Sequence, residues 1–356
     1  DVLRKDILHI YNMGVFDNIE HNVVQKNGEN ILEVSTKPSL DNNGEIRLAL
    51  GIEDDFSGHS TYTLKFGYTM FGINDFGAEW KNDFEIGRRD KAYTEFYQPL
   101  NATQRFYVKP SLSYRDIHEL VLAKSFGFNN QGALDTEVKR YGASLKLGAY
   151  LFRDYSLELG LSRYQDVNNI ELLDYKQEYD AVPLTVSLNV DDLDDLHFPT
   201  SGLKSEIIWT KEMSDFGSDY DYEQIYASVK KPFNYKAHNI TATVKYGETY
   251  ESHGPSSLAG NFYLGGLFNL SGFVPYTLID ENMFLAVAKY RYQIKDGGFF
   301  GSLNTPLYAG FSYEVGNTWG DGESFELGAM HQSGTVYVAA DTIFGPFYLA
   351  YGIADN

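Results

Sequence analysis

The sequence predicts an antiparallel β-barrel that crosses a membrane, and three observations support this fold class. Apolar and polar side chains alternate over many segments of about ten residues, as they do in transmembrane barrel strands. Aromatic residues make up 15% of the chain, with 28 Tyr and 24 Phe. No run of about 18 apolar residues could form a transmembrane helix. Tyrosine suits the boundary between lipid and water, because its ring is apolar and its hydroxyl is polar.

The first forty residues differ from the rest. Leu3, Ile7 and Ile10 stand at helical spacing before Gly14, which predicts a helix over 2–13. Two short strands, FDNIEHNVVQ and ENILEVSTKP, follow around an Asn-Gly pair at 27–28, a dipeptide typical of hairpins. A helix and one hairpin are too small to fold alone. We therefore expect residues 1–40 to be the C-terminal part of an α+β module and residues 41–356 to be the barrel.

From about residue 44 onward the side chains alternate with a period of two. In 60–70, for example, Tyr62 and Leu64 lie on one face, and Thr63 and Lys65 lie on the other. Apolar faces would meet lipid, and charged faces would meet a wet lumen. Two acidic stretches, 166–180 and 213–223, are predicted to be external loops. The pattern predicts about fifteen strands: 45–52, 60–70, 77–87, 92–99, 105–114, 143–151, 155–163, 182–190, 203–211, 219–230, 240–248, 283–292, 305–315, 334–342 and 347–353.

A soluble β-sandwich or propeller is the alternative fold, because its strands also alternate. The predicted strands, however, are longer than the usual length of about five or six residues. Their number exceeds that of one sandwich, and no repeat of propeller period is visible. A closed barrel explains the pattern better, since it leaves no unpaired strand edge in lipid.

Charge and composition exclude several function classes. Lys plus Arg is 29 and Asp plus Glu is 49, which gives a net charge of −20. A nucleic-acid binder needs a basic surface, so this balance argues against one. The chain has no Cys, and its eight His show no paired-ligand spacing, so no metal or cofactor is predicted. The excess acid is expected to line the lumen and the external loops, and an acidic lumen would favour cations if it were open.

Five motifs, in order, resemble those of the BamA/TamA outer-membrane assembly superfamily. The segment VDDLDDLHFPTSG (190–202) is similar to its Asp-rich, Phe-Pro-x-x-Gly turn, and LGGLFNLSGF (264–273) is similar to its lid-loop motif. YEVGNTW (313–319) resembles its strand end, and DTIFGPFYLAYG (341–352) resembles its penultimate hairpin. Residues 14–38 resemble the end of a POTRA domain, the periplasmic module that precedes such barrels. Each motif alone is weakly specific, but five in this order are specific.

The resemblance implies a sixteen-stranded barrel in the bacterial outer membrane, with the POTRA fragment in the periplasm. The sequence stops at Asp355-Asn356, in what resembles the last turn of that form, so we expect the closing strand to be missing. The resemblance also implies three groups of site residues. They are the lid-loop residues Gly265, Gly266, Leu270, Ser271, Gly272 and Phe273; the acidic turn residues Asp191, Asp194, Phe198, Pro199 and Gly202; and the strand-end residues Glu314, Gly316, Asn317 and Trp319.

In the resembled family the lid loop folds into the lumen, and its arginine pairs with acidic residues of the inner wall. Ser271 stands where that arginine is usual and can only hydrogen-bond, which contributes about 1 kcal/mol. We expect the loop to dock through its backbone and Phe273, or to be held more loosely; the alternative is a disordered surface loop. A phosphate cradle is excluded, because no Lys-Ser/Thr pair and no helix follow the glycines.

The same resemblance implies that Asp191 and Asp194 are structural residues of the inner wall. Four aspartates, at 191, 192, 194 and 195, form the densest acidic cluster of the sequence. The cluster lacks the EF-hand pattern that calcium would need. A solvated turn before Phe198-Pro199 is therefore favoured over a metal site.

Several sequence segments narrow the resemblance to one group within this superfamily. GAEW (77–80), EFYQPL (95–100), GPFYLAYGIA (345–354) and Ser271 are similar to the bacterial patatin-like phospholipase autotransporters of the PlpD type, which belong to type V secretion. This implies a barrel that anchors or translocates an N-terminal patatin-like lipase to the cell surface. The nucleophile motif Gly-x-Ser-x-Gly is absent, and both Gly58-His59-Ser60-Thr61 and Asp296-Gly297-Gly298 only look similar to lipase motifs. The chain itself is expected not to be an enzyme.

The resemblance implies partners as well: outer-membrane lipid and lipopolysaccharide, the chain's own N-terminal passenger domain, and the barrel-assembly machinery that inserts it. A homodimer stays open, as does the export route, through the lumen or through a lateral seam. Three alternatives remain. A general assembly or translocation factor of the BamA/TamA type would carry the arginine form of the lid motif. A passive porin would lack that motif, and a surface lipase could use the barrel only as an anchor.

Overall fold

The computed structural model describes residues 16–26, 29–38, 44–54, 60–87, 89–122, 133–152, 154–170, 175–253, 261–275, 277–295, 306–320, 323–342 and 345–355. The predicted helix over 2–13, the turn at 27–28, and the segments Gly58-His59 and Asp296-Gly297-Gly298 lie outside these residues. Within the described ranges, no helix is long and apolar enough to cross a membrane. Two short 3-10 helices, η3 (Ser214–Phe216) and η4 (Leu327–Ala329), interrupt a chain that is otherwise mostly strand.

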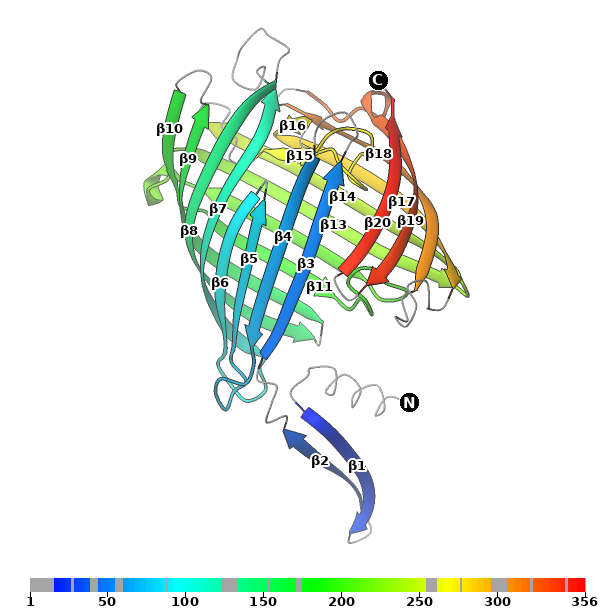
Figure 1. Ribbon diagram of the computed structural model, residues 1–356. Coiled ribbons are helices and arrows are strands. Elements are labelled where there is room, and N and C mark those ends of the chain that lie inside the picture. The colour runs from blue at the N-terminus through cyan, green and yellow to red at the C-terminus, as the bar shows by residue number, and fades with distance from the viewer. Residues whose placement is uncertain are drawn as a thin grey trace.

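One nearly closed antiparallel sheet forms the barrel (Figure 1). Fifteen strands follow one another around it, all at the predicted positions, so the predicted barrel fold is confirmed. They are β3 (Gly44–Asp54), β4 (Ser60–Met70), β5 (Glu79–Gly87), β6 (Arg89–Pro99), β7 (Phe106–Leu122), β8 (Ala133–Phe152), β9 (Tyr155–Ile170), β11 (Leu184–Asp191), β12 (Lys204–Glu212), β13 (Asp221–Tyr235), β14 (His238–His253), β17 (Asn282–Lys295), β18 (Leu307–Trp319), β19 (His331–Thr342) and β20 (Gly345–Ala354).

The two ends of this sheet lie next to each other. β3 and β20 face each other around the barrel (Figure 1), but no strand pairing joins them among the described residues. Both strands therefore keep one edge with backbone groups that the sheet does not satisfy. We call this place the seam.

The prediction of a loop over 166–180 is wrong for residues 166–170 and 175–180, which form strands. β9 continues to Ile170, and β10 (Tyr175–Ala181) pairs with its upper part, from Tyr175↔Ile170 to Ala181↔Tyr164. β11 pairs with the lower part of the same strand. Pro183 lies between β10 and β11 and has no N–H to continue the ladder. The acidic residues of this segment suggested a loop, although its side chains alternate as in a strand that continues above the apolar part of the barrel. The second predicted loop, 213–223, is correct only up to residue 220, because β13 begins at Asp221.

Large apolar side chains cover the outer face of the barrel. Ile46, Leu50 and Leu349 are 64%, 61% and 61% exposed. The neighbouring inward positions carry charges, as in the ion pair between Arg47 and Asp83 at 3.4 Å. A soluble sandwich or propeller would bury its apolar face and would not leave so much apolar surface exposed. The observed arrangement is that of a barrel in lipid, and it excludes the soluble alternatives.

Aromatic residues mark the upper edge of the apolar face, which is the end away from β1 and β2. The rings of Tyr114 and Tyr141 lie there with their centroids 5.1 Å apart. Each of several such rings donates its polar hydrogen to the first carboxylate above it, as expected of an interfacial aromatic belt. These pairs are Tyr114–Asp116 at 3.1 Å, Trp209–Glu223 at 2.8 Å and Tyr246–Glu248 at 2.6 Å.

Outside the barrel, β1 (Phe16–Lys26) and β2 (Glu29–Pro38) form the hairpin predicted for this segment. Their pairing runs from Phe16↔Pro38 to Lys26↔Glu29. In Figure 1 this hairpin lies beyond the lower end of the barrel, where β3 begins. The lower end of the barrel is thus the end from which the N-terminal residues extend.

Candidate functional site: the lid loop and the inner wall

The connection between β14 and β17 is packed against the inner wall of the barrel. Its two short strands, β15 (Phe262–Leu264) and β16 (Leu278–Asp280), pair with each other and contact β18 (Figure 1). Leu264 and Leu270 are fully buried and pack against Met283, Leu285 and Val287 of β17. Burial of this apolar surface stabilises a docked loop. The lid loop, residues 264–273, is therefore ordered on the wall and is not a disordered surface loop.

Ser271 joins the lid loop to a buried carboxylate of β18. Its backbone N–H donates to Glu314 Oε2 at 2.7 Å, and its hydroxyl donates to Glu314 Oε1 at 2.8 Å. Glu314 has no exposed surface, and Ser271 is 2% exposed. The hydroxyls of Ser312 and Ser333 donate to the same carboxylate at 2.7 and 3.3 Å. Two hydrogen bonds from Ser271 reach this carboxyl group, so serine holds the loop more firmly than one side-chain hydrogen bond would.

Hydrogen bonds within the loop fix its shape. Gly265 N–H donates to the Asn269 carbonyl at 2.7 Å, and Gly266 N–H donates to the Phe273 carbonyl at 3.0 Å. Phe268 N–H donates to the Ser271 hydroxyl at 2.8 Å. Ser271 thus links the tip of the loop to Glu314. Lys245 of β14 adds a contact from the wall, because its Nζ donates to Asn269 Oδ1 at 3.1 Å.

The lid loop also lies directly against β20, one of the two strands of the seam. Gly272 has a φ of +102°, and a Cβ at this position would come within 2.6 Å of the Ile353 carbonyl carbon and the Ala354 nitrogen. A Cβ at Gly352 of β20 would come within 2.9 Å of Ser271 Cβ. Two glycines therefore allow the backbones to approach closely. Displacement of the lid loop would uncover the inner side of β20.

The Phe-Pro turn, residues 192–203, closes the lower end of β11 and β12 and is organised by its aspartates. Asp194 accepts hydrogen bonds from the Thr200 hydroxyl at 2.5 Å and from the N–H groups of Thr200 and Ser201 at 2.8 and 3.0 Å. Burial acts to raise the pKa of Asp194, but these hydrogen bonds outweigh it and hold the pKa below its ordinary value of 3.8. The carboxylate thus stabilises the turn in its charged form.

The other aspartates of the turn act in the same local way. Asp195 Oδ1 accepts from the N–H of Phe198 at 2.6 Å, and Asp192 accepts from the N–H of Leu203. Asp191, at the end of β11, pairs with Lys204 at 2.5 Å. Within the described residues no group of three or more His, Asp or Glu side chains could hold a metal ion. The cluster is a hydrogen-bonded turn.

Arg291 of β17 connects this turn to the inner wall. Its Nη2 donates to the carbonyl oxygens of Phe198 and Pro199 at 2.6 and 2.8 Å. The guanidinium also lies over the Phe198 and Tyr308 rings, with Cζ 5.4 and 5.2 Å from their centroids. Arg291 is 4% exposed. A buried guanidinium that binds backbone carbonyls is well placed to hold the turn inside the barrel.

The Phe-Pro turn and the lid loop meet at one aromatic cluster. Phe198 stacks on Tyr308 at 4.7 Å and on Tyr348 at 5.8 Å between centroids. Phe268, at the tip of the lid loop, contacts Tyr337 and Tyr348 edge to face at 5.3 and 5.4 Å. Tyr348 belongs to β20, so both insertions rest on this strand. Segments from opposite ends of the barrel thus share one packing site beside the seam.

The strand-end motif of β18 supports the upper part of the wall. A Cβ at Gly316 would lie 2.6 Å from the Phe284 carbonyl oxygen. Asn317 Nδ2 donates to the Ala329 carbonyl at 2.9 Å and so holds the loop that contains η4. Trp319 is 8% exposed and packs edge to face with Phe325 at 5.7 Å. Glu314 is the residue of this motif that hydrogen-bonds to the lid loop, through Ser271.

The comparisons with known proteins decide the family. The Omp85 superfamily domain matches residues 48–356. The chain belongs to the Omp85 superfamily. A search of curated protein sequences gave no significant match.

Solved structures of Omp85 proteins share the fold of this chain. BamA from Haemophilus ducreyi lacking POTRA domains 1–3 superimposes with a TM-score of 0.70 at 16% identity, over 98% of this chain and 73% of that one. CdiB from Escherichia coli gives 0.65 at 12% identity, over 95% and 63%. CdiB from Acinetobacter baumannii gives 0.61 at 10% identity, over 97% and 67%. The chain is therefore an outer-membrane barrel with the Omp85 fold, and it spans about two thirds of the CdiB chains.

Sequence reasoning found the motifs of this Omp85 barrel but missed the residues that join them. Glu314 was singled out as part of a strand end, not as the partner of Ser271. Arg291, Lys289 and the tyrosines of the aromatic cluster were not singled out at all. Lys289 and Arg291 do lie on the inward face of the predicted strand 283–292, so two cations beside a lid motif were the signal that could have found them.

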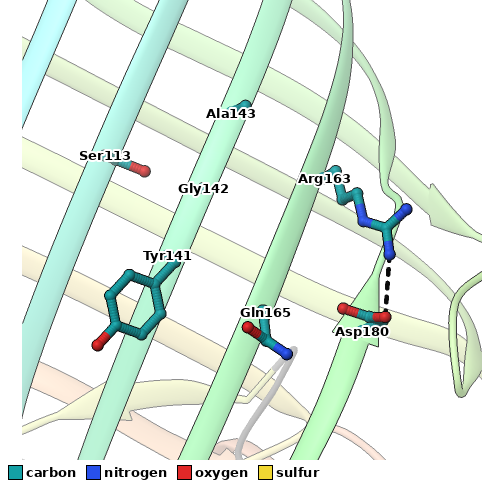
Figure 2. Close-up of a pocket in the computed structure, with 7 residues that line it drawn as sticks. All are labelled: Ser113, Tyr141, Gly142, Ala143, Arg163, Gln165 and Asp180. Atoms are coloured by element: carbon teal, nitrogen blue, oxygen red, sulfur yellow. Dashed lines mark hydrogen bonds and ion pairs between the residues drawn. The ribbon is translucent and has the colours of Figure 1, made fainter.

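A pocket on the outside of this Omp85 barrel lies across β7 to β10 (Figure 2). It contains the ion pair between Arg163 and Asp180 at 3.0 Å, in which the Arg163 side chain is 70% exposed. An ion pair so exposed contributes little to stability or binding. We assign the pocket to the outer surface at the level of the aromatic belt, because Tyr141 of the belt lines it. Its lining residues are Ser113, Tyr141, Gly142, Ala143, Arg163, Gln165 and Asp180.

Proposed function

We propose that this chain is the membrane-embedded part of an outer-membrane autotransporter, which anchors or translocates an N-terminal patatin-like lipase to the cell surface. The chain itself performs no chemistry in this proposal. Residues 1–40 are the end of a periplasmic POTRA domain, and the preceding passenger is the catalytic part. The work of the barrel is physical: it inserts in the outer membrane and gives the passenger a path or an anchor.

The docked lid loop is the observation that carries the transport part of this proposal. The loop occupies the inner wall through Ser271 and Glu314 and lies on β20 through Gly272. Its release would open space in the lumen and uncover a seam strand in one movement. A polypeptide in extended form could then pair with a free strand edge. BamA and CdiB share the fold, and their family context supports a role in assembly or translocation.

Ser271 supports the narrower lipase assignment. A general assembly factor of the BamA/TamA type would carry arginine at this position, by the resemblance described above. The variants GAEW, EFYQPL and GPFYLAYGIA match the patatin-like autotransporter form along the rest of the chain. A general assembly or translocation factor is the second candidate, and the Omp85 fold favours it equally.

A porin fits the structure less well. A passive pore needs an open lumen, whereas here the lid loop and the Phe-Pro turn meet inside the barrel at Tyr348. Planar-bilayer recording tests this point. We expect small currents from the intact chain and larger ones when residues 262–280 are replaced by a short Gly-Ser linker. Large, stable currents that are equal in both proteins would identify a porin.

The presence of a lipase passenger is tested by reading the natural gene, and its delivery is tested in whole cells. The coding sequence ahead of Asp1 should contain a hydrolase domain with Gly-x-Ser-x-Gly, and tandem POTRA domains alone would replace the proposal with an assembly factor. In whole cells, the lipase domain should be cleaved by external protease only when the barrel is present. A lipase that stays protected in cells with a correctly inserted barrel would contradict surface delivery.

A further inference from the structure

Charged side chains are distributed unevenly over the inner wall of the barrel, which differs from the acidic lumen that the sequence predicts. On the β3–β9 side the inward cations are paired with carboxylates. These pairs include Arg47–Asp83 at 3.4 Å, Lys65–Glu85 at 3.5 Å, Lys146–Glu158 at 3.4 Å and Arg140–Asp166. On the β13–β17 side, Lys230, Lys289 and Arg291 have no carboxylate within ion-pair distance among the described residues. The chain has a net charge of −20, so a group of three cations without ion-pair partners is unusual in it.

These three cations lie close enough to repel one another. The charge of Lys289 interacts unfavourably with those of Lys230 and Arg291, and that of Lys230 interacts unfavourably with Arg291 and Lys204. Asp191 and Asp195 act favourably on Lys230, and Glu314 acts favourably on Lys289, but none of them forms an ion pair with these cations. The direct contacts of Lys289 and Arg291 are with aromatic faces. Lys289 Nζ lies 4.6 Å from the centroid of Phe268 in the lid loop, and Arg291 lies over Phe198. Cation–π contact offsets only part of such repulsion.

A second observation points to a missing partner. Arg291 is 4% exposed, and its Nη1 has no hydrogen-bond partner, whereas Nη2 is bound to two carbonyls. A buried donor without an acceptor destabilises the structure, because nothing offsets the loss of its contact with water. Such groups are rare and call for an acceptor from outside the chain. The free Nη1 donor favours an oxyanion, because hydrogen bonds from a guanidinium to a charged oxygen are strong.

We propose that Lys230, Lys289 and Arg291 form an oxyanion-binding site on the inner wall, which takes a phosphate group. Three cations suit a ligand with two charges and several acceptor oxygens, since lysine binds phosphate as a point charge and arginine binds it with directed donors. The phosphate could belong to a lipid headgroup or be free in the periplasm. Its chemistry at the site is the same in both cases.

A bound phosphate would also hold the lid loop closed. Lys289 contacts Phe268 of the lid loop, and Arg291 contacts the Phe-Pro turn. An anion between these cations offsets their repulsion and keeps Lys289 and Arg291 in the positions from which they contact the two insertions. Phosphate binding therefore shifts the lid loop toward the docked state. The size of the shift is set by how much more tightly phosphate binds the docked state than the released state. The site is independent of which passenger the barrel carries.

The test uses the purified full chain in nonionic detergent with chloride as the only other anion. Inorganic phosphate and a short-chain phosphatidic acid are titrated separately, and binding is followed by phosphorus NMR line width and by protease cleavage within residues 262–280. We expect saturable binding of at least one probe, with a dissociation constant of about 1 mM or below, and slower cleavage as binding saturates. Binding of the lipid alone would identify a headgroup as the ligand, and binding of both probes would identify the phosphate group itself.

Two variants make the result specific. Lys230→Gln removes one cation that has no hydrogen bond or ion pair among the described contacts, and it should weaken binding by about fivefold or more. Lys65→Gln removes an inward cation of the opposite wall and should leave binding unchanged. The heat-induced mobility shift of folded barrels in gels confirms that both variants fold. Failure of both probes to saturate, or an equal loss of binding in both variants, would overturn the proposal.

Discussion

Ser271 occupies a position where the superfamily motif has arginine, yet it keeps the lid loop on the acidic residue of the wall. Two hydrogen bonds from one residue reach Glu314, one from the backbone and one from the side chain. A backbone donor does not depend on residue type. The position can therefore lose its cation without losing all contact with the carboxylate. We expect the serine hydroxyl and the packing around it to supply the rest of the docking free energy.

Replacement of Ser271 by alanine should loosen the lid loop measurably. The change removes a donor to the buried Glu314 and the acceptor of the Phe268 N–H. Each of the two lost hydrogen bonds contributes about 0.5 to 1.5 kcal/mol. The rate of protease cleavage within residues 262–280 should rise by about tenfold or more. Ser271→Thr, which keeps a hydroxyl, is the matched control, and an equal rate in Ser271→Ala and the intact protein would show that the hydroxyl does not set docking.

Asp194 should make the Phe-Pro turn sensitive to acid. Its pKa in the folded protein is below the ordinary value of 3.8, because hydrogen bonds favour the charged form. A depressed pKa contributes stability that is complete above the unfolded value and is lost as the pH falls through the folded value. Hydrogen exchange of residues 192–203 should thus be constant from about pH 8 to pH 5 and should speed up, after correction for intrinsic rates, below about pH 4.

The control for this effect is the loss of the carboxylate itself. Asp194→Ala should exchange quickly at every pH and show no step in acid, whereas Asp215→Ala, in the loop between β12 and β13, should keep the step. A step of the same size in Asp194→Ala would assign the acid sensitivity to another group.

At the scale of elements, the sequence predicted the strands well and the insertions poorly. Strands such as β4 alternate strictly, so their position and their faces follow from the sequence. β10 was missed, because it lies above the apolar band and its outward side chains are charged. The docked form of the lid loop depends on Glu314, which is distant in sequence, and on left-handed backbone at Phe268 and Leu270, with φ of 58° and 71°. No local pattern encodes such a contact.

The close approach of the lid loop to β20 gives an element-scale prediction. Gly272→Val places a side chain into the β20 backbone, with the nearest atoms 2.6 Å from its Cβ, in a backbone conformation that valine avoids. The lid loop should leave β20 while the barrel stays folded, and protease cleavage within 262–280 should increase. Gly328→Val is the matched control, since a Cβ there would meet nothing within 4 Å. Unchanged protection in Gly272→Val would mean that β20 adjusts to the loop.

At the scale of the whole molecule, the lid loop, the Phe-Pro turn and the seam form one coupled unit. Tyr348 of β20 contacts Phe268 of the lid loop and Phe198 of the turn, and Gly352 of the same strand faces Ser271. The sequence motifs indicated each part separately. Their coupling depends on the closure of the sheet, which brings residues from opposite ends of the barrel to one strand. A movement at the seam and a movement of the lid loop should therefore occur together.

A disulfide between the lid loop and β20 tests this coupling directly. The chain has no cysteine, so Ser271→Cys with Gly352→Cys can form only one bridge. A Cβ at Gly352 would lie 2.9 Å from Ser271 Cβ, somewhat closer than the distance of about 3.8 Å in disulfides, so a small shift allows the bond. When oxidised, this variant should show no lid release, lower bilayer conductance and no delivery of the passenger to the cell surface. The same protein after reduction is its own control and should recover conductance and delivery. Normal delivery by the oxidised protein would show that transport needs neither release of the lid loop from β20 nor the space that the loop occupies.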